Sequence, residues 1–182
     1  MVRLAFVRLT NSKDMQPGSL SPETHSAEEV ARLLQLAPLE PEGGYFRRTA
    51  ESDVMWPGTG RRAWSVIYML ITPDGFSAMH RLGTDEVWSF LAGDPLESLR
   101  LAPDGAGKMA YLGSNPAGGE IPLDVIPAQI WQGTRLRPGG RWALVSNVVA
   151  PEFLWSDFEL GGRVALTAEY PAFSAAISTL TR

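Results

Sequence analysis

Between residues 45 and 170, apolar residues occur in short runs that Gly, Pro or Asp residues separate. In "AWSVIYMLI" (63–71) both alternating sets of side chains are largely apolar, which is typical of a strand that is buried on both faces. Six further runs have the length and composition of strands: "EVWSFLA" (86–92), "ESLRLA" (97–102), "KMAYLG" (108–113), "LDVIPA" (123–128), "RWALVSNVVA" (141–150) and "RVALTAE" (163–169). The sequences "PDG" at 73–75 and 103–105 and "RPGG" at 137–140 indicate turns. Strands at this density, with little helix between them, predict an all-β antiparallel sandwich or barrel.

Helical periodicity is confined to segments near the two ends of the chain. In "SAEEVARLLQL" (26–36), Ser26 is a candidate N-cap with Glu29 three residues later, and apolar residues recur at helical spacing. The segment "PAFSAAISTLT" (171–181) predicts a short closing helix. Residues 1–25 are polar, without periodicity and marked by Pro, Gly and Ser, so we expect a flexible leader that precedes one domain at 26–182.

Charge and composition narrow the classes of partner. The sequence has 16 Lys and Arg residues and 20 Asp and Glu residues, and the basic residues are scattered in short groups. This distribution argues against a nucleic-acid partner. The sequence has no run of about 20 apolar residues and no secretory signal, so we expect a cytoplasmic protein with no membrane partner. The absence of cysteine excludes disulfides, thiolate metal sites and a cysteine nucleophile.

Two motifs resemble those of the cupin superfamily. His80, Leu82, Glu86 and Gly93 fall at the spacing of the first cupin motif, in which a second histidine occupies the position of Leu82. The segment "PAQIWQG" (127–133) resembles the second motif, with Gln129 in the place of its glycine and Gln132 in the place of its histidine. Leu82 and Gln132 therefore replace two of the four residues that usually bind the metal in cupins.

The chain resembles the cupin_5 (DUF985) family more specifically. It contains "PEGGYF" (41–46), "HRLGTDEVWSFLAGDPL" (80–96), "WQ" (131–132) and "VAPEFLWSDFEL" (149–160) in the order typical of that family. The resemblance implies a double-stranded β-helix, the cupin jelly-roll barrel, with a short helix at each end. It also implies a small-molecule pocket inside the barrel and a homodimer.

Alternation along the strands decides which candidate functional side chains lie on the same face. His80 and Leu82 share one face, and Glu86, Trp88 and Phe90 share one face of the next strand. If these faces line the barrel, as the resemblance implies, one imidazole and one carboxylate meet an aromatic wall. We therefore expect His80 and Glu86 to be the catalytic acid–base pair. The opposite face carries Arg81 and Asp85, for which we expect a salt bridge between the two strands.

Substrate-binding roles are predicted for five residues around this pair. They are Trp88, Phe90, Gln132, Tyr45 and Glu42. The aromatic rings and the Gln132 amide could hold the face of a sugar ring, and Trp131 could join them. Glu42 and Tyr45 could reach the mouth of the pocket from "PEGGYF", although a tight entry into an edge strand explains that segment equally.

Three functions remain open at the level of sequence. The first is a metal-independent isomerase or epimerase that acts on a sugar or sugar-nucleotide-like substrate. The second is a non-catalytic cupin that binds a metabolite. The third is a metal-dependent oxygenase or isomerase, in which His80, Glu86 and Gln132 hold a divalent metal. An imidazole, a carboxylate and a neutral amide form a weak ligand set, so we expect no cofactor to be held tightly.

Overall fold

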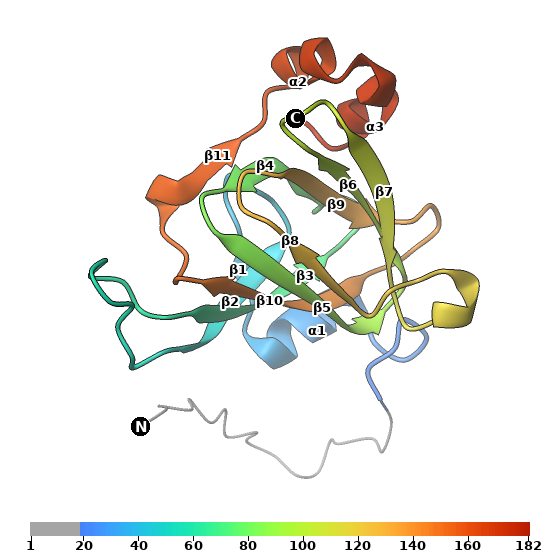
Figure 1. Ribbon diagram of the computed structural model, residues 1–182. Helices are drawn as coiled ribbons and strands as arrows, with labels where there is room; N and C mark the ends of the chain where they lie inside the picture. The colour runs from blue at the N-terminus through green and yellow to red at the C-terminus, as the bar shows by residue number, and fades with distance from the viewer. Residues whose placement is uncertain (1–18) are drawn as a thin grey trace.

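The computed structural model describes residues 19–182 and shows two antiparallel sheets packed face to face (Figure 1). The six-stranded sheet has the order β1 (Ala37–Pro38), β2 (Tyr45–Glu51), β3 (Ser65–Ile71), β10 (Ala143–Ala150), β5 (Asp85–Gly93) and β8 (Leu123–Ile126). The five-stranded sheet has the order β11 (Phe158–Leu160), β4 (Ser77–Leu82), β9 (Trp131–Leu136), β6 (Leu96–Leu101) and β7 (Gly107–Leu112). Strands that are distant in sequence are neighbours in both sheets, as in a jelly roll. The predicted all-β cupin barrel is therefore confirmed.

The main core lies between the two sheets. Its buried members include Met69 and Ile71 from β3, Trp88 from β5 and Leu96 from β6. The outward side chains of β3 are covered as well, because Leu70 packs in a second cluster against helix α1 (Ala27–Leu34). This explains why the sequence of β3 is apolar on both alternating sets, as predicted.

The predicted N-terminal helix is confirmed with its cap. The Ser26 hydroxyl accepts from the backbone N–H of Glu29, and the Glu29 carboxylate accepts from the backbone N–H of Ser26, which completes a capping box. The described part of the leader predicted at 1–25 is residues 19–25, and the rest lies outside the described residues. Within that part, Glu23 pairs with Arg141, and the carbonyl of His25 accepts from the indole of Trp142.

The C-terminal segment covers the outer face of the five-stranded sheet (Figure 1). It contains α2 (Arg163–Glu169) and α3 (Ser174–Thr179), which bury Leu166 and Ile177 against the outward side chains Leu99 and Leu101 of β6. Within the part of the chain that the structure describes, three short 3₁₀ turns complete the elements, at Pro116–Gly118, Trp155–Asp157 and Pro171–Phe173.

The prediction of a strand at 163–169 was wrong, because this segment forms α2. The alternation of apolar residues in this segment does not decide which of them are buried, because Val164 is 85% exposed whereas Leu166 is buried. Tyr170, four residues after Leu166, is buried beside it. Spacing of four residues places both on one helical face. The predicted closing helix is confirmed in α3.

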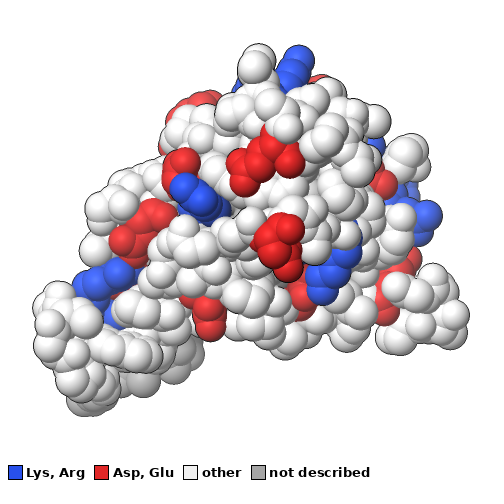
Figure 2. All heavy atoms as spheres, turned by 45° about the horizontal axis from the view of Figure 1, so that its top comes forward, with Lys and Arg blue, Asp and Glu red and all other residues white. Residues whose placement is uncertain are grey.

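The charged surface and the helices have two features that bear on possible partners. On the face drawn in Figure 2, basic and acidic residues are interspersed and do not gather into one basic patch. No helix within residues 19–182 has the length and apolar character needed to cross a bilayer. The cytoplasmic location stays a prediction.

Candidate functional site

A cavity of about 260 Å³ lies between the sheets, among β2, β3, β4, β5 and β10. Its polar lining consists of Glu42, Arg48, Ser65, His80, Glu86 and Asn147. Its apolar lining consists of Leu39, Phe46, Ile67, Met69, Leu82, Val149, Phe153 and Trp155. A mostly apolar cavity with a few convergent polar groups is the usual form of a small-molecule site.

His80 extends into this cavity from β4 and is held by two contacts. Its Nδ1 lies 2.8 Å from the carbonyl oxygen of Ala78, which can only accept, so Nδ1 carries a proton. Its ring stacks on Phe158 of β11, with the ring centroids 5.1 Å apart. Burial lowers the pKa of His80, against the opposing effect of Glu86. The neutral ring therefore keeps its lone pair on Nε2, where it can accept a proton.

Glu86, from β5, receives a hydrogen bond on each carboxylate oxygen. Nε2 of Gln132 donates to Oε2 at 2.6 Å, and Nδ2 of Asn147 donates to Oε1 at 3.1 Å. These amides come from β9 and β10, so the two sheets meet at this carboxylate. Burial raises the pKa of Glu86, while the neighbouring His80 lowers it. Glu86 is thus a buried carboxyl group that two amides hold in place.

Glu42 is the third titratable group of the cavity. Its Oε1 accepts from the Ser77 hydroxyl at 2.6 Å and lies 3.9 Å from Nδ1 of His80. Burial raises the pKa of Glu42 to about 7, although the Ser77 hydrogen bond opposes the change. A group with this pKa is present in both protonation states at neutral pH.

The double glycine of "PEGGYF" explains how Glu42 reaches the interior. Gly43 has a φ of +112°, and a Cβ at this position would lie 2.3 Å from the carbonyl oxygen of Phe76. Only glycine tolerates both the conformation and the close approach. Arg182 then donates to the carbonyl oxygen of Glu42 at 2.7 Å and fixes this turn.

The other predicted substrate-binding residues lie at different depths. Gln132 is buried behind the cavity and contacts it through Glu86. Trp88 and Phe90 pack in the core of the barrel and do not line the cavity. Tyr45 lies on the outer face, against the cluster that contains α1, and Trp131 faces α2 and α3. The structure therefore brings together His80, Glu86, Glu42 and Gln132, and leaves Tyr45 and Trp131 outside.

The expected salt bridge between Arg81 and Asp85 was wrong. Arg81 pairs with Glu159 of β11 at 2.6 Å, and its guanidinium lies over the ring of Trp131. Asp85 instead accepts from the backbone N–H of Ala128 at 2.8 Å. Strand pairing explains the outcome, because β11 pairs with β4 and places Glu159 opposite Arg81.

Sequence reasoning missed several lining residues, of which Asn147 is the most informative. In β10, Val145, Asn147 and Val149 share the inward face, so Asn147 is a polar residue on an otherwise apolar face. That pattern could have identified it. Phe153 and Trp155 belong to the "VAPEFLWSDFEL" segment and pack with Phe158 as an aromatic cover over the cavity. No local signal shows that this segment folds back over the site.

The donor set does not fit a tightly bound transition metal. Both oxygens of Glu86 accept from amide N–H groups, and Gln132 offers its nitrogen rather than its oxygen to that carboxylate. His80 is the only imidazole in the cavity, and Leu82 occupies the second histidine position. Within residues 19–182 there is no cluster of three or more His, Cys, Asp or Glu side chains that could hold a metal ion. One imidazole and one engaged carboxylate form a weak ligand set.

The family follows from comparison of the whole sequence. Residues 28–161 match the sequence profile of Cupin_5, described as a cupin superfamily family (DUF985). The chain belongs to the Cupin_5 family. An uncharacterized protein of Saccharomyces cerevisiae, YML079W, is 28% identical over 134 residues, which span 65% of each chain. The match thus covers slightly less than two thirds of the yeast protein.

Solved structures support the Cupin_5 architecture. Protein SO0799 of Shewanella oneidensis is 34% identical, with a TM-score of 0.81 over 87% of this chain and 98% of that chain. A hypothetical protein from Leishmania major is 30% identical, with a TM-score of 0.80 over 86% of this chain and 99% of that chain. The oxalate decarboxylase of Lactobacillus farciminis, solved with formate, is 12% identical, with a TM-score of 0.51 over 81% of this chain and 42% of its own. This last similarity shows the fold alone.

In the second motif of this Cupin_5 protein, a glutamine adopts a backbone conformation that favours glycine. Gln129 has a φ of +68°, the left-handed conformation that glycine adopts without strain. Its backbone N–H donates to the carbonyl oxygen of Leu82 at 2.8 Å, which ties the turn to the end of β4. The following strand, β9, then places Gln132 opposite His80.

Proposed function

We propose that the barrel cavity is a proton-transfer site for a small hydroxylated carbonyl compound, and that the protein is a metal-independent isomerase or epimerase. The observation that carries this proposal is the meeting of His80, Glu86 and Glu42 in one cavity of about 260 Å³. Burial shifts the pKa of the imidazole downward and the pKa values of both carboxyl groups upward. The upward shifts move the two carboxyl groups toward the range in which general acid catalysis is efficient at neutral pH, and the downward shift keeps the imidazole unprotonated, as a general base must be.

The hydrogen bonds suggest a division of roles between these groups. His80 has Nε2 free to accept a proton from a carbon next to a carbonyl group, because Nδ1 is occupied by Ala78. A carboxyl group with a raised pKa, Glu42 or Glu86, can supply a proton to the carbonyl oxygen in the same step. Return of a proton to the same carbon from its opposite face, with the proton on the carbonyl oxygen going back to the carboxylate, completes an epimerisation. Delivery to the former carbonyl carbon, with the proton of the neighbouring hydroxyl going to the carboxylate, completes an isomerisation, and in both cases the protein is unchanged.

The lining favours a substrate of the size of a single sugar ring. The aromatic side chains of Phe153 and Trp155 offer surfaces to the apolar face of a ring, and Asn147 and Ser65 offer polar groups to hydroxyls. A nucleotide attached to the sugar would have to remain outside a cavity of about 260 Å³. We therefore infer that a sugar-nucleotide substrate would insert only its sugar.

Hydrogen exchange with solvent tests the proposal directly. The purified protein is incubated in D₂O with a panel of aldoses, ketoses and sugar nucleotides, and deuterium incorporation at carbon is followed by NMR. Proton removal next to the carbonyl incorporates deuterium even when the chemical equilibrium favours the starting sugar. Incorporation that requires His80 supports the proposal, whereas its absence with every bound compound contradicts it.

A non-catalytic metabolite-binding protein is the second candidate, and one observation favours it. His80 is fixed at Nδ1 by a backbone carbonyl and stacked on Phe158, which are contacts that a purely structural histidine also makes. In that case the panel would reveal binding without deuterium incorporation. A metal-dependent oxygenase or isomerase receives no such support, because the donor set fits a metal poorly.

We also propose that the protein is a homodimer formed through β2. Strand β1 pairs only with Tyr45 and Phe46, so the rest of the outer edge of β2 has no strand partner within residues 19–182. An open strand edge is commonly covered by another chain. A twofold pair of β2 strands would cover both edges at once.

A further inference from the structure

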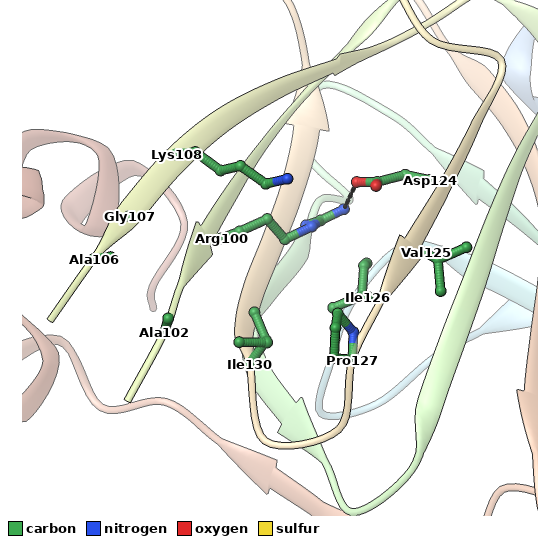
Figure 3. A pocket seen from close by; sticks show the side chains of 10 residues that line it. All are labelled: Arg100, Ala102, Ala106, Gly107, Lys108, Asp124, Val125, Ile126, Pro127 and Ile130. Carbon is green, nitrogen blue, oxygen red and sulfur yellow. Dashed lines mark hydrogen bonds and ion pairs between the residues drawn. The ribbon is translucent and has the colours of Figure 1, made fainter. Parts of the chain in front are cut away.

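A second cavity, of about 290 Å³, opens between the far edges of the two sheets (Figure 3). It lies among β6, β7 and β8 and the turn that leads into β9. It shares no lining residue with the cavity around His80. The two cavities are therefore separate, and the acid–base site does not account for the second.

Two cations and one carboxylate form the polar part of this second cavity. In Figure 3, the side chains of Arg100 and Lys108 extend from β6 and β7 toward Asp124 of β8. One guanidinium nitrogen of Arg100, Nη2, lies 3.3 Å from Oδ2 of Asp124. Lys108 makes no ion pair within residues 19–182. The cavity thus holds one positive charge more than its own carboxylate can balance.

Arg100 is a buried cation with unused hydrogen-bonding capacity. The residue is only 4% exposed, and its Nε–H has no hydrogen-bond partner within the part of the chain that the structure describes. Its Nη1 donates to the Ser98 hydroxyl, so the guanidinium is held in place. Burial lowers the pKa of Arg100 to about 10, which leaves it charged at neutral pH. A buried charge with an unpartnered donor is costly, and an anion bound in the cavity would offset part of that cost through its opposite charge.

The remaining walls of the cavity are apolar. They include Val125, Ile126 and Pro127 on one side and Ala102 and Ile130 on the other. A fully inorganic anion would leave these surfaces in contact with water. A ligand with an apolar body would bury them and place its charged group against the cations.

We propose that this second cavity binds a small organic carboxylate with an apolar body. A carboxylate carries a single charge and two oxygens, which match the one excess positive charge and the two donors of Lys108 and Arg100. A phosphate dianion would face Asp124 with a charge that the site does not balance. The cavity is small for a ligand site, so the body is of the size of one aromatic ring or a short branched chain.

Calorimetric titration of the full-length protein with benzoate tests the proposal, with benzamide as the uncharged control of the same shape. Benzoate should bind at least about 10-fold more tightly than benzamide, because only benzoate carries a charge for the two cations. Inorganic phosphate serves as the comparison for an anion without an apolar body. Phosphate binding as tight as that of benzoate would overturn the assignment to an organic carboxylate.

Variants of Lys108 locate the site. Lys108 is exposed, so Lys108→Gln should leave the fold intact while it weakens benzoate binding by about 10-fold, and Lys108→Arg should retain the binding. Lys108 is also the one lysine within residues 19–182, so bound benzoate should slow its acylation, measured on its peptide by mass spectrometry. Unchanged affinity in Lys108→Gln, or unchanged acylation, would show that the carboxylate does not bind in this cavity.

Discussion

Nε2 of Gln132 lies 2.6 Å from Oε2 of Glu86, and this hydrogen bond connects β9 of one sheet to β5 of the other. The spacing of the second cupin motif predicts where Gln132 lies, but not which of its two amide atoms faces Glu86. Because the nitrogen faces the carboxylate, Gln132 donates a hydrogen bond to Glu86, whereas a histidine at this position would offer a lone pair to a metal. The substitution therefore changes a ligand position into a support for a carboxyl group.

The first prediction concerns metal binding. We expect protein washed with a chelator to retain much less than one equivalent of Fe, Mn, Ni or Zn, because the shell has one imidazole and an engaged carboxylate. The double variant Leu82→His, Gln132→His completes the motif and should retain a divalent metal after the same wash. Mass spectrometry of the metal content compares the two. Near-stoichiometric metal in the washed wild-type protein, lost in Glu86→Ala, would contradict this prediction.

The second prediction concerns the proton carrier. His80→Gln should lower deuterium incorporation by about 10²-fold or more, because glutamine cannot accept the substrate proton at neutral pH. His25→Gln is the matched control, since His25 is the other histidine of the chain and does not line the cavity. Thermal unfolding shows whether each variant is folded. Equal losses in both variants, or no loss in His80→Gln, would remove His80 from the reaction.

The third prediction concerns stability and pH at Glu42. Its pKa is about 7 in the folded protein, against an ordinary value of 4.5. The folded state therefore binds this proton more tightly than the unfolded state does. The resulting stabilisation is present below about pH 4.5 and is lost as the pH rises to about 7. Glu42→Gln cannot ionise, so it lacks this loss.

Urea unfolding of wild-type protein and Glu42→Gln across pH measures the effect. The free energy of unfolding of the variant, relative to wild type, should rise by about 1 to 3 kcal/mol between about pH 5 and pH 8 and then level off. The titrations of His80 and Glu86 occur in both proteins and largely cancel in the difference. A difference that stays constant over this range would show that Glu42 titrates normally.

The fourth prediction concerns the turn before β9. Gln129 is exposed and has a φ of +68°, so its side chain adds strain and little burial. Gln129→Gly should raise the free energy of unfolding by about 0.5 to 1 kcal/mol, because glycine adopts this conformation freely. Gln129→Ala keeps the Cβ and should give no gain. Denaturant titration of the three proteins distinguishes strain from a contribution of the side chain.

The fifth prediction concerns association through β2. Light scattering at micromolar concentration should give about twice the chain mass of 19.8 kDa. The amide hydrogens of residues 47–51 should exchange faster on dilution, because the free edge of β2 is covered only in the dimer. Those of β10, which lies between β3 and β5, serve as the internal control. A monomer under these conditions would refute the predicted dimer.

Sequence alone predicted the barrel, because its strands are apolar in patterns that differ from helix. Alternation also predicted which side chains share a face with His80 and with Glu86, and the family resemblance implied that these faces point inward. The sequence did not predict β9 as a strand, because Gln132, Thr134 and Arg135 make this segment polar. Their polarity follows from contacts that only the fold creates, such as the bonds of Gln132 to Glu86 and of Arg135 to Glu97.

The sequence did not predict the aromatic cover of the cavity, for a related reason. Phe153 and Trp155 lie far along the chain from His80 and reach it only because β11 pairs with β4. Such long-range pairing leaves no periodic signal in the segment itself. Alternation likewise could not separate Trp88, which fills the core, from a residue that lines a cavity, because both point inward.

The aromatic cover gives the protein an optical reporter of its own. Trp155 lines the cavity and is 52% exposed, whereas Trp88, Trp131 and Trp142 are each less than 10% exposed and lie outside the lining. A ligand that enters the cavity removes water from the Trp155 indole and leaves the surroundings of these buried indoles nearly unchanged. Its arrival should therefore shift the intrinsic fluorescence to shorter wavelength, so that unlabelled compound libraries can be screened against the native protein.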